Sequence, residues 1–249
     1  MIRVSARPRE NESTAEHKPI GGERVDRPGR TLSQRPLHFF FVIDCSGSMA
    51  AEGKIQSLNN AIREALPHLA DVARQNPDAA LLVRALAFST GWRWHVAEPT
   101  PVDALHWPDL QASGFTDLGE ALTELARQLH VPPMEERAYP PAIVLVSDGQ
   151  PTDDFHAGMR ALLAEPWGMR AVRMAVAIGR DTDHAVLQEF IGNPEITPVT
   201  ANNPEQLARL IRWTSTVASR ASSDVVTPTR RFGLTPRLDV ASDSEDVVF

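Results

Sequence analysis

The sequence predicts an α/β fold with a central, mostly parallel sheet, one antiparallel edge strand and helices on both faces. Two observations support this prediction. Continuously apolar runs such as His38–Asp44 are typical of strands that are covered on both faces. Segments with helical periodicity fall between these runs, and such strand–helix alternation favours parallel strands joined by right-handed crossovers.

The predicted strands are short apolar segments in the central part of the chain. In order, they are His38–Asp44, Leu81–Phe88, Trp92–Ala97, Ala142–Asp148, Arg173–Ile178 and Ile196–Val199. A turn at residues 89–91 joins the second to the third, which predicts a hairpin and therefore an antiparallel edge strand. Trp92 and Trp94 would share one face of this hairpin, where they could pack against a helix or contact a partner. Ile196–Val199 would close the opposite edge.

The predicted helices carry apolar residues at three- and four-residue intervals. The longest spans residues 54–75, and its apolar residues are Ile55, Leu58, Ile62, Leu66, Leu69 and Val72. A second helix, with Thr116 or Asp117 as its N-cap, is marked by Leu118, Leu122, Leu125 and Leu129. The remaining predicted helices are Phe155–Leu163, His184–Phe190 and Pro204–Ala218.

Composition divides the chain into three parts. Residues 1–36 are rich in Arg, Glu, Gly and Pro and lack apolar periodicity, so we expect a disordered N-terminal arm. Residues 37–220 should form a single folded domain, and residues 221–249 a flexible tail. In this tail, Thr227, Thr229 and Thr235 are candidate phosphorylation sites, and its acidic residues are candidate autoinhibitory ligands.

Bulk properties limit the classes of partner and compartment. The net charge of −7 argues against a nucleic-acid-binding surface. A single cysteine allows no internal disulfide, which favours a reducing compartment. The sequence shows no signal peptide and no apolar run long enough to cross a bilayer. We therefore expect a cytoplasmic protein with neither nucleic acid nor membrane as a partner.

The end of the first predicted strand carries a set of oxygen ligands. Asp44, Ser46 and Ser48 lie at positions i, i+2 and i+4, so an extended backbone would point their side chains the same way. Carboxylates and hydroxyls suit Mg²⁺ or Ca²⁺ better than zinc or copper. The three residues therefore predict one side of a metal site.

Two other loops carry oxygen ligands in similar positions. Thr116 opens a predicted helix, and Asp148 ends a predicted apolar strand. In open α/β sheets, ligands bind beyond the carboxyl ends of the strands, where the strand order reverses. We therefore expect these loops to meet the one that contains Asp44.

These five residues resemble the metal-ion-dependent adhesion site of the von Willebrand factor type A (vWA) family, a three-layer, Rossmann-like α/β fold. The resemblance covers roughly residues 36–220 and includes a D-x-S-x-S loop, a distal Thr and a distal Asp. It implies that Asp44, Ser46, Ser48, Thr116 and Asp148 hold Mg²⁺, with Mn²⁺ and Ca²⁺ as alternatives. It also implies that the hydroxyls contact the ion directly and the aspartates act largely through water.

The resemblance further implies a protein-interaction module whose partner donates an Asp or Glu carboxylate to the metal. The segments FVIDCSGSM and LVSDGQPTDD are most similar to bacterial intracellular vWA proteins of the tellurite-resistance Y type. That similarity implies a bacterial cytosolic complex in stress response, tellurite resistance or phage defence. Ser/Thr kinase-like and PP2C-like proteins are the partners it suggests.

Other interpretations remain open at this point. The serines could cap the helix that begins near Lys54, without any metal. The chain could be an adaptor subunit of an AAA+ ATPase, or a metal-dependent phosphoesterase with Asp148 or Asp153 as a base. No nucleophile elbow, Walker loop or H-E-x-x-H pair occurs, and no His or Lys lies in the ligand loops. We therefore expect no enzymatic activity.

Neighbouring residues are expected to play supporting roles. Asp117, Asp153 and Asp154 are predicted to be rim charges or helix caps, without a ligand role. Cys45, between two site residues, is predicted to point into the core.

Overall fold

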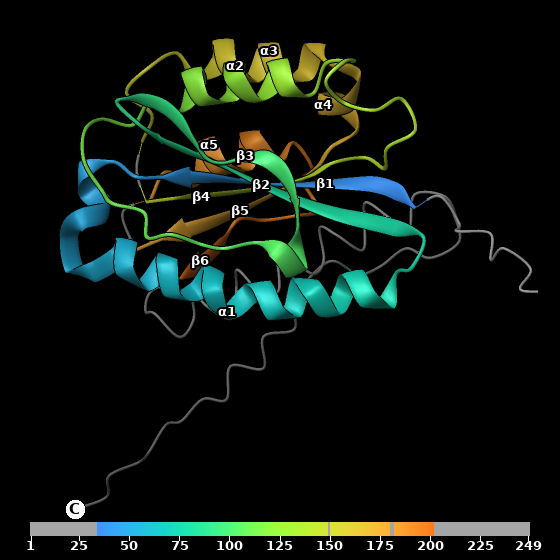
Figure 1. Cartoon of the computed structure of the whole chain (residues 1–249). Helices are drawn as coiled ribbons and strands as arrows, with labels where there is room; N and C mark the ends of the chain where they lie inside the picture. Colours follow the sequence, from blue (N-terminus) through green and yellow to red (C-terminus); the bar gives the residue numbers. More distant parts are fainter. Residues whose placement is uncertain (1–33, 149, 180–181, 202–249) are drawn as a thin grey trace, which may run out of the picture. The chain divides into compact units, whose positions relative to one another are not determined.

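The computed structural model describes residues 34–148, 150–179 and 182–201. Every described residue belongs to one compact unit, which spans Ser33–Phe249. The described residues build a six-stranded sheet with the strand order β3-β2-β1-β4-β5-β6 (Figure 1). The predicted helix Pro204–Ala218 and most of the two predicted terminal segments lie outside the described residues.

The sheet is parallel except at one edge. Its strands are β1 (Arg35–Asp44), β2 (Ala79–Ser89), β3 (Gly91–Pro101), β4 (Ala142–Ser147), β5 (Val172–Ile178) and β6 (Val199–Ala201). β3 pairs antiparallel with β2, whereas the other neighbouring strands pair in parallel. The predicted fold class, with its antiparallel edge hairpin, is confirmed.

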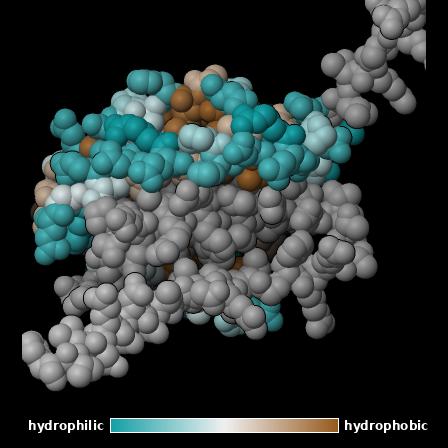
Figure 2. Space-filling view, turned by 90° about the horizontal axis from the view of Figure 1, so that it is seen from below, coloured by the Kyte–Doolittle hydropathy of each residue, from teal (hydrophilic) through white to brown (hydrophobic). Residues whose placement is uncertain are grey.

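Helices cover both faces of the sheet. They are α1 (Lys54–Gln75), α2 (Leu118–Gln128), α3 (Phe155–Ala164), α4 (Pro166–Arg170) and α5 (His184–Ile191). Figure 1 shows α1 on one face and α2 with α3 on the other. The outward side of α1 is polar, with Asn60, Arg63 and Glu64 exposed. From below, the described surface is accordingly mainly hydrophilic (Figure 2).

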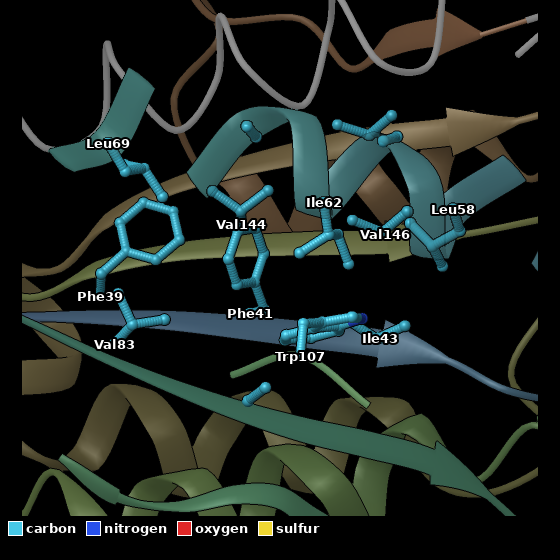
Figure 3. Close-up of a cluster of buried hydrophobic side chains, with 14 of the residues drawn as sticks. Phe39, Phe41, Ile43, Leu58, Ile62, Leu69, Val83, Trp107, Val144 and Val146 are labelled. Carbon is cyan, nitrogen blue, oxygen red and sulfur yellow. The ribbon is translucent and has the colours of Figure 1, made fainter. Parts of the chain in front are cut away.

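Side-chain alternation along β1 divides the core into two layers. Phe39, Phe41 and Ile43 pack on the α1 side, as Figure 3 shows, whereas Phe40 and Val42 pack on the side of α2 and α3. All five side chains are completely buried. A strand buried on both faces must be apolar at every position, which explains the continuous run that predicted it.

The close approach of α2 to α3 depends on two glycines. A Cβ atom added at Gly158 would lie 2.4 Å from the carbonyl oxygen of Gly119, and one added at Gly119 would lie 2.3 Å from the carbonyl oxygen of Asp154. Because these contacts are with backbone atoms, no side-chain rearrangement could make room for a methyl group. The two helices can therefore pack at this distance only with glycine at both positions.

The chain path creates a switch point beside β1. From β1 the chain passes to β2 on one side, and later returns to β4 on the other. Asp44 ends β1, and Asp148 directly follows β4. The carboxyl ends of these two strands are therefore adjacent, at the position where open α/β sheets bind ligands.

The structure corrects the predicted elements in a few places. β1 begins at Arg35, inside the segment predicted to be a disordered arm, because Arg35 pairs with Ala79 of β2. The last strand comprises Val199–Ala201 and not Ile196–Val199, since Ile196 lies in a turn and donates its N–H to Asn193. Ile196 is apolar because it packs in the core, and its hydrophobicity therefore does not indicate a strand.

No helix among the described residues is both long and apolar enough to cross a membrane.

Candidate metal site

Asp44 is the buried anchor of the site. Its side chain lies at the end of β1, and one carboxylate oxygen accepts the N–H of Ser46 at 2.8 Å. The other oxygen accepts the hydroxyl of Ser147 at 2.6 Å. Burial raises the pKa of Asp44, the hydrogen bonds from Ser147 and Ser46 oppose this rise, and the nearby charge of Asp148 adds to it. A cation at this point would stabilise the ionised carboxylate.

The two serines form a hydrogen-bonded chain with Asp148. The hydroxyl of Ser48 donates to Oδ1 of Asp148 at 2.7 Å, and the two serine Oγ atoms are 2.9 Å apart. Because Ser48 gives its single hydroxyl hydrogen to the carboxylate, Ser46 must be the donor between the serines. Residues that are 100 positions apart in the sequence thus meet at one point.

Neither serine caps a helix. Ser46 precedes the 3₁₀ helix η1 (Gly47–Gly53) without making a side-chain capping bond, and Ser48 lies within η1. The N-cap of α1 is Gly53, which has a left-handed backbone conformation and no capping side chain. The interpretation of these serines as helix caps is therefore wrong. Their hydroxyls are directed toward each other and toward Asp148.

The loop that carries Thr116 packs against both of the other loops. Gly47 donates its N–H to the carbonyl of Gly114 at 2.9 Å, which connects it to the loop after β1. Thr116 and Thr152 are joined twice, by Thr116 N–H to Thr152 Oγ1 at 3.0 Å and by Thr152 N–H to the Thr116 carbonyl at 2.9 Å. Within the described residues, no hydrogen bond joins the Thr116 hydroxyl to the other four predicted ligands. The structure therefore joins Ser46, Ser48 and Asp148 by their side chains and Asp44 to the Ser46 backbone N–H, and it places Thr116 nearby through its backbone.

Asn59 supports this loop and was not singled out from the sequence. Its side chain is buried on α1, where its amide donates to the carbonyl of Leu110 at 3.0 Å. Its oxygen accepts from Leu110 N–H at 2.9 Å and from the indole of Trp107 at 3.2 Å. Asn59 thus fixes the segment that leads to Thr116. The sequence feature that could have drawn attention to Asn59 is its position beside Leu58, on the apolar side of an amphipathic helix.

Three further aspartates hold helix starts and loops: Asp154 is the helix cap that was predicted, whereas Asp117 stands at the N-cap position of α2 without a side-chain capping bond. Asp153 accepts N–H groups of Gly119 and Glu120, at the start of α2, at 2.9 and 2.7 Å. Asp154 caps α3 by accepting from Ala157. Asp117 accepts from Gly91 N–H at 2.8 Å and from the Thr152 hydroxyl at 2.9 Å, so it ties the loop to the edge hairpin.

Lys54 reaches the site from outside the ligand loops, which themselves contain no lysine. Its ammonium lies 2.6 Å from Oδ2 of Asp148 and donates a hydrogen bond to it. The side chain of Asp148 is 1% exposed and that of Lys54 is 22% exposed. Lys54 could not be recognised as a site residue from the sequence, because it lies outside the ligand loops, as the first residue of α1.

Cys45 points away from the site, as predicted. Its backbone bonds to Phe88 and Ser113, and its side chain belongs to the core cluster. Burial raises the pKa of its thiol to about 12, and the thiolate that nucleophilic chemistry requires is therefore scarce at neutral pH.

The donor set suits a hard divalent cation. Two buried carboxylates, Asp44 and Asp148, lie beside the hydroxyls of Ser46 and Ser48, and oxygen ligands of this kind are those that Mg²⁺ and Ca²⁺ select. Lys54 compensates only one of the two negative charges. Among the described residues, no group of three or more His, Cys, Asp and Glu side chains could hold a metal. A metal here would therefore depend on the hydroxyls.

Comparison with solved structures shows relatives of this fold. A vWA protein from Catenulispora acidiphila has a TM-score of 0.57 at 18% identity, over 74% of this chain and 43% of its own. The ArnB paralog VWA2 from Sulfolobus acidocaldarius has a TM-score of 0.52 at 20% identity, over 70% and 44%. Proximal thread matrix protein 1 from the mussel byssus, with a zinc-occupied adhesion-site motif, has a TM-score of 0.53 at 17% identity, over 76% and 46%.

This chain spans less than half the length of each of these three proteins, and at such identities the likeness shows the fold alone. A search of curated proteins found no match. The family model described as "von Willebrand factor type A domain" matches residues 39–212, which is more than half of the chain. The chain therefore belongs to the von Willebrand factor type A family.

Proposed function

We propose that this protein is a metal-dependent protein–protein interaction module. Its divalent ion, Mg²⁺ in our proposal, is held by Asp44, Ser46, Ser48, Thr116 and Asp148. The observation that carries the proposal is the chain of hydrogen bonds from Ser46 through Ser48 to Asp148, made by hydroxyls that cap no helix. The zinc-occupied motif of the mussel relative supports a divalent ion at this position in the fold.

The protein residues prepare the site for an anionic ligand. The hydroxyls are neutral, so they orient toward a cation without cancelling its charge, and Ser147 fixes the carboxylate of Asp44. When bound, Mg²⁺ would supply the positive charge that attracts a carboxylate from the partner. We therefore propose that the partner presents an Asp or Glu side chain.

Two exposed aromatic residues adjoin the site and would contact the same partner. Phe115 directly precedes Thr116 and is 65% exposed, while Trp92 is 39% exposed. The N–H of Phe115 bonds to the hydroxyl of Thr90 at 3.1 Å, which places the loop against the edge hairpin. Large apolar side chains are typical anchors of protein interfaces. A partner segment with apolar residues near its acidic residue would fit this edge.

For the biological setting we propose a bacterial cytosolic complex in stress response, tellurite resistance or phage defence. The similarity of two short segments to the tellurite-resistance Y type supports this, and kinase-like and PP2C-like proteins would then be partners. An adaptor subunit of an AAA+ ATPase is the alternative that uses the same site. A phosphoesterase is less well supported, because both oxygens of each candidate base are already engaged: those of Asp148 by Ser48 and Lys54, and those of Asp153 by backbone N–H groups of α2.

A pull-down with purified full-length protein tests the proposed function. We expect Mg²⁺-dependent capture of a specific partner, lost in chelator and in the double variant Asp44→Ala, Ser46→Ala. Ser57→Ala is the matched control, because Ser57 lies on α1 and its hydroxyl donates to the carbonyl of Gly53, the N-cap of that helix, and not to a proposed ligand. Identification of the captured protein separates a kinase or phosphatase complex from an ATPase. Capture that persists in chelator, or in the double variant, would refute the mechanism.

A further inference from the structure

Lys54 is directed into the site by an unusual piece of backbone. Glu52 and Gly53 both have positive φ angles, 54° and 69°, and they turn the chain from η1 into α1. Lys54 follows as the first residue of α1. Its Cε and Nζ atoms lie 3.7 Å from the point where a Cβ on Gly179 would be, so the side chain passes along the end of β5 toward Asp148.

Both carboxylate oxygens of Asp148 are engaged by the protein itself. Ser48 donates to Oδ1 at 2.7 Å, and Lys54 donates to Oδ2 at 2.6 Å. With only 1% of the Asp148 side chain exposed, solvent provides little alternative stabilisation for its charge. The ammonium of Lys54 is therefore the counter-ion of this carboxylate.

We propose that Lys54 is a tethered cation that competes with the divalent metal for Asp148, and thereby sets the metal affinity of the site. The proposal rests on the metal site proposed above. An ammonium beside Asp148 repels a second cation that approaches the same carboxylate, and water screens this repulsion little because the Asp148 side chain is buried. Lys54 is partly exposed, at 22%, so its ammonium can move toward solvent when it yields Asp148.

A purely structural role for Lys54 makes a different prediction. If the salt bridge only held Asp148 in place, its loss would leave the carboxylate misplaced and would weaken metal binding. If Lys54 competes, its loss would strengthen metal binding although the protein without metal becomes less stable, because Asp148 then has no counter-ion. The direction of the affinity change separates the two roles.

The experiment compares full-length wild-type protein with Lys54→Met and Lys54→Arg. Methionine keeps an unbranched side chain without the charge, and arginine keeps the charge. Calorimetric titration with Mn²⁺ and with Mg²⁺ measures affinity, and thermal unfolding in chelator measures stability. We expect roughly tenfold tighter binding or more in Lys54→Met, together with a lower unfolding temperature in chelator. Lys54→Arg should bind with an affinity close to that of the wild type.

Each other outcome has a defined meaning. Equal or weaker metal binding by Lys54→Met, where the wild type binds, overturns the competition and leaves the proposed metal site intact. Binding by Lys54→Met where the wild type shows none supports both proposals. Absence of binding in both proteins overturns both. Adding Asp44→Ala to each protein should abolish binding, which verifies that the signal comes from this site.

Discussion

At the scale of single residues, the site combines two buried carboxylates with a small number of oriented donors. Asp44 and Asp148 are both at least nine-tenths buried, and each depends on serine hydroxyls for hydrogen bonds. Concentrated negative charge of this kind lowers stability unless a cation compensates it. The residues that prepare the site for function therefore lower the stability of the fold.

The variant Asp44→Asn tests whether the buried negative charge of Asp44 lowers the stability of the fold, through the pH dependence of that stability. Because the pKa of Asp44 in the fold is raised above the ordinary value of 3.8, the folded state binds this proton more tightly than the unfolded chain. Ionised Asp44 therefore lowers stability at neutral pH, and this loss is relieved as the pH falls through the raised pKa. In chelator at neutral pH, Asp44→Asn should be at least as stable as the wild type, with no metal-induced stabilisation.

Urea denaturation in chelator, from neutral pH to about pH 4, measures this difference. The advantage of Asp44→Asn over the wild type should shrink as the pH falls. A variant that is less stable than the wild type at neutral pH, or an advantage that grows in acid, would contradict this account of Asp44.

At the scale of elements, buried contacts between helices and loops hold the ligand loops in register. Asn59 of α1 fixes the segment before Thr116, and Asp153 binds the first N–H groups of α2. The glycine contact of α2 with α3 brings the loop that contains Asp153 to the start of α2. Two predictions concern these supports.

Asn59→Ala should lower the free energy of unfolding by about 3 kcal/mol, because it leaves buried polar groups of Trp107 and Leu110 without partners. Asn60→Ala on the exposed side of the same helix is the control, with an expected change within about 0.5 kcal/mol. Urea denaturation of both variants measures the difference. Equal stability of the two would show that Asn59 does not anchor the loop.

Gly158→Ala should destabilise the protein by about 2 kcal/mol, although alanine favours a helix, because the new methyl group meets the backbone of Gly119. The exposed Arg160→Ala on the same helix should change stability by no more than about 0.5 kcal/mol. Thermal or urea unfolding compares them. A stabilised Gly158→Ala variant would mean that α2 and α3 are not packed this closely.

At the scale of the whole molecule, the carboxyl edge of the sheet combines the metal site with exposed aromatic residues. Phe115→Ala should leave folding and metal affinity unchanged, since the side chain is 65% exposed, but should weaken partner binding about tenfold. Met169→Ala is a matched control, because Met169 is 64% exposed and lies on α4, which precedes the amino end of β5. Equal partner affinity of the two variants would exclude Phe115 from the interface.

Much of the fold and of the candidate site could be predicted, because the sequence patterns that indicate them are local. The apolar run of β1 and the periodicity of α1 fix their elements, and the D-x-S-x-S loop follows directly from the end of β1. The predicted strand Ile196–Val199 was wrong because a buried residue in a turn, such as Ile196, is as apolar as one in a strand. Lys54 and Asn59 could not be assigned from sequence, since their roles depend on tertiary contacts with Asp148 and Leu110.

Direct titration of the full-length protein with Mn²⁺ tests the central claim that these five residues form a divalent-metal site. We expect one ion per chain in the wild type and no binding in Asp44→Ala, Ser46→Ala. Thr116→Ala should weaken binding about tenfold, as expected for the loss of one ligand contact. Unchanged Mn²⁺ affinity in the double variant would contradict the account. So would the absence of binding in both the wild type and Lys54→Met.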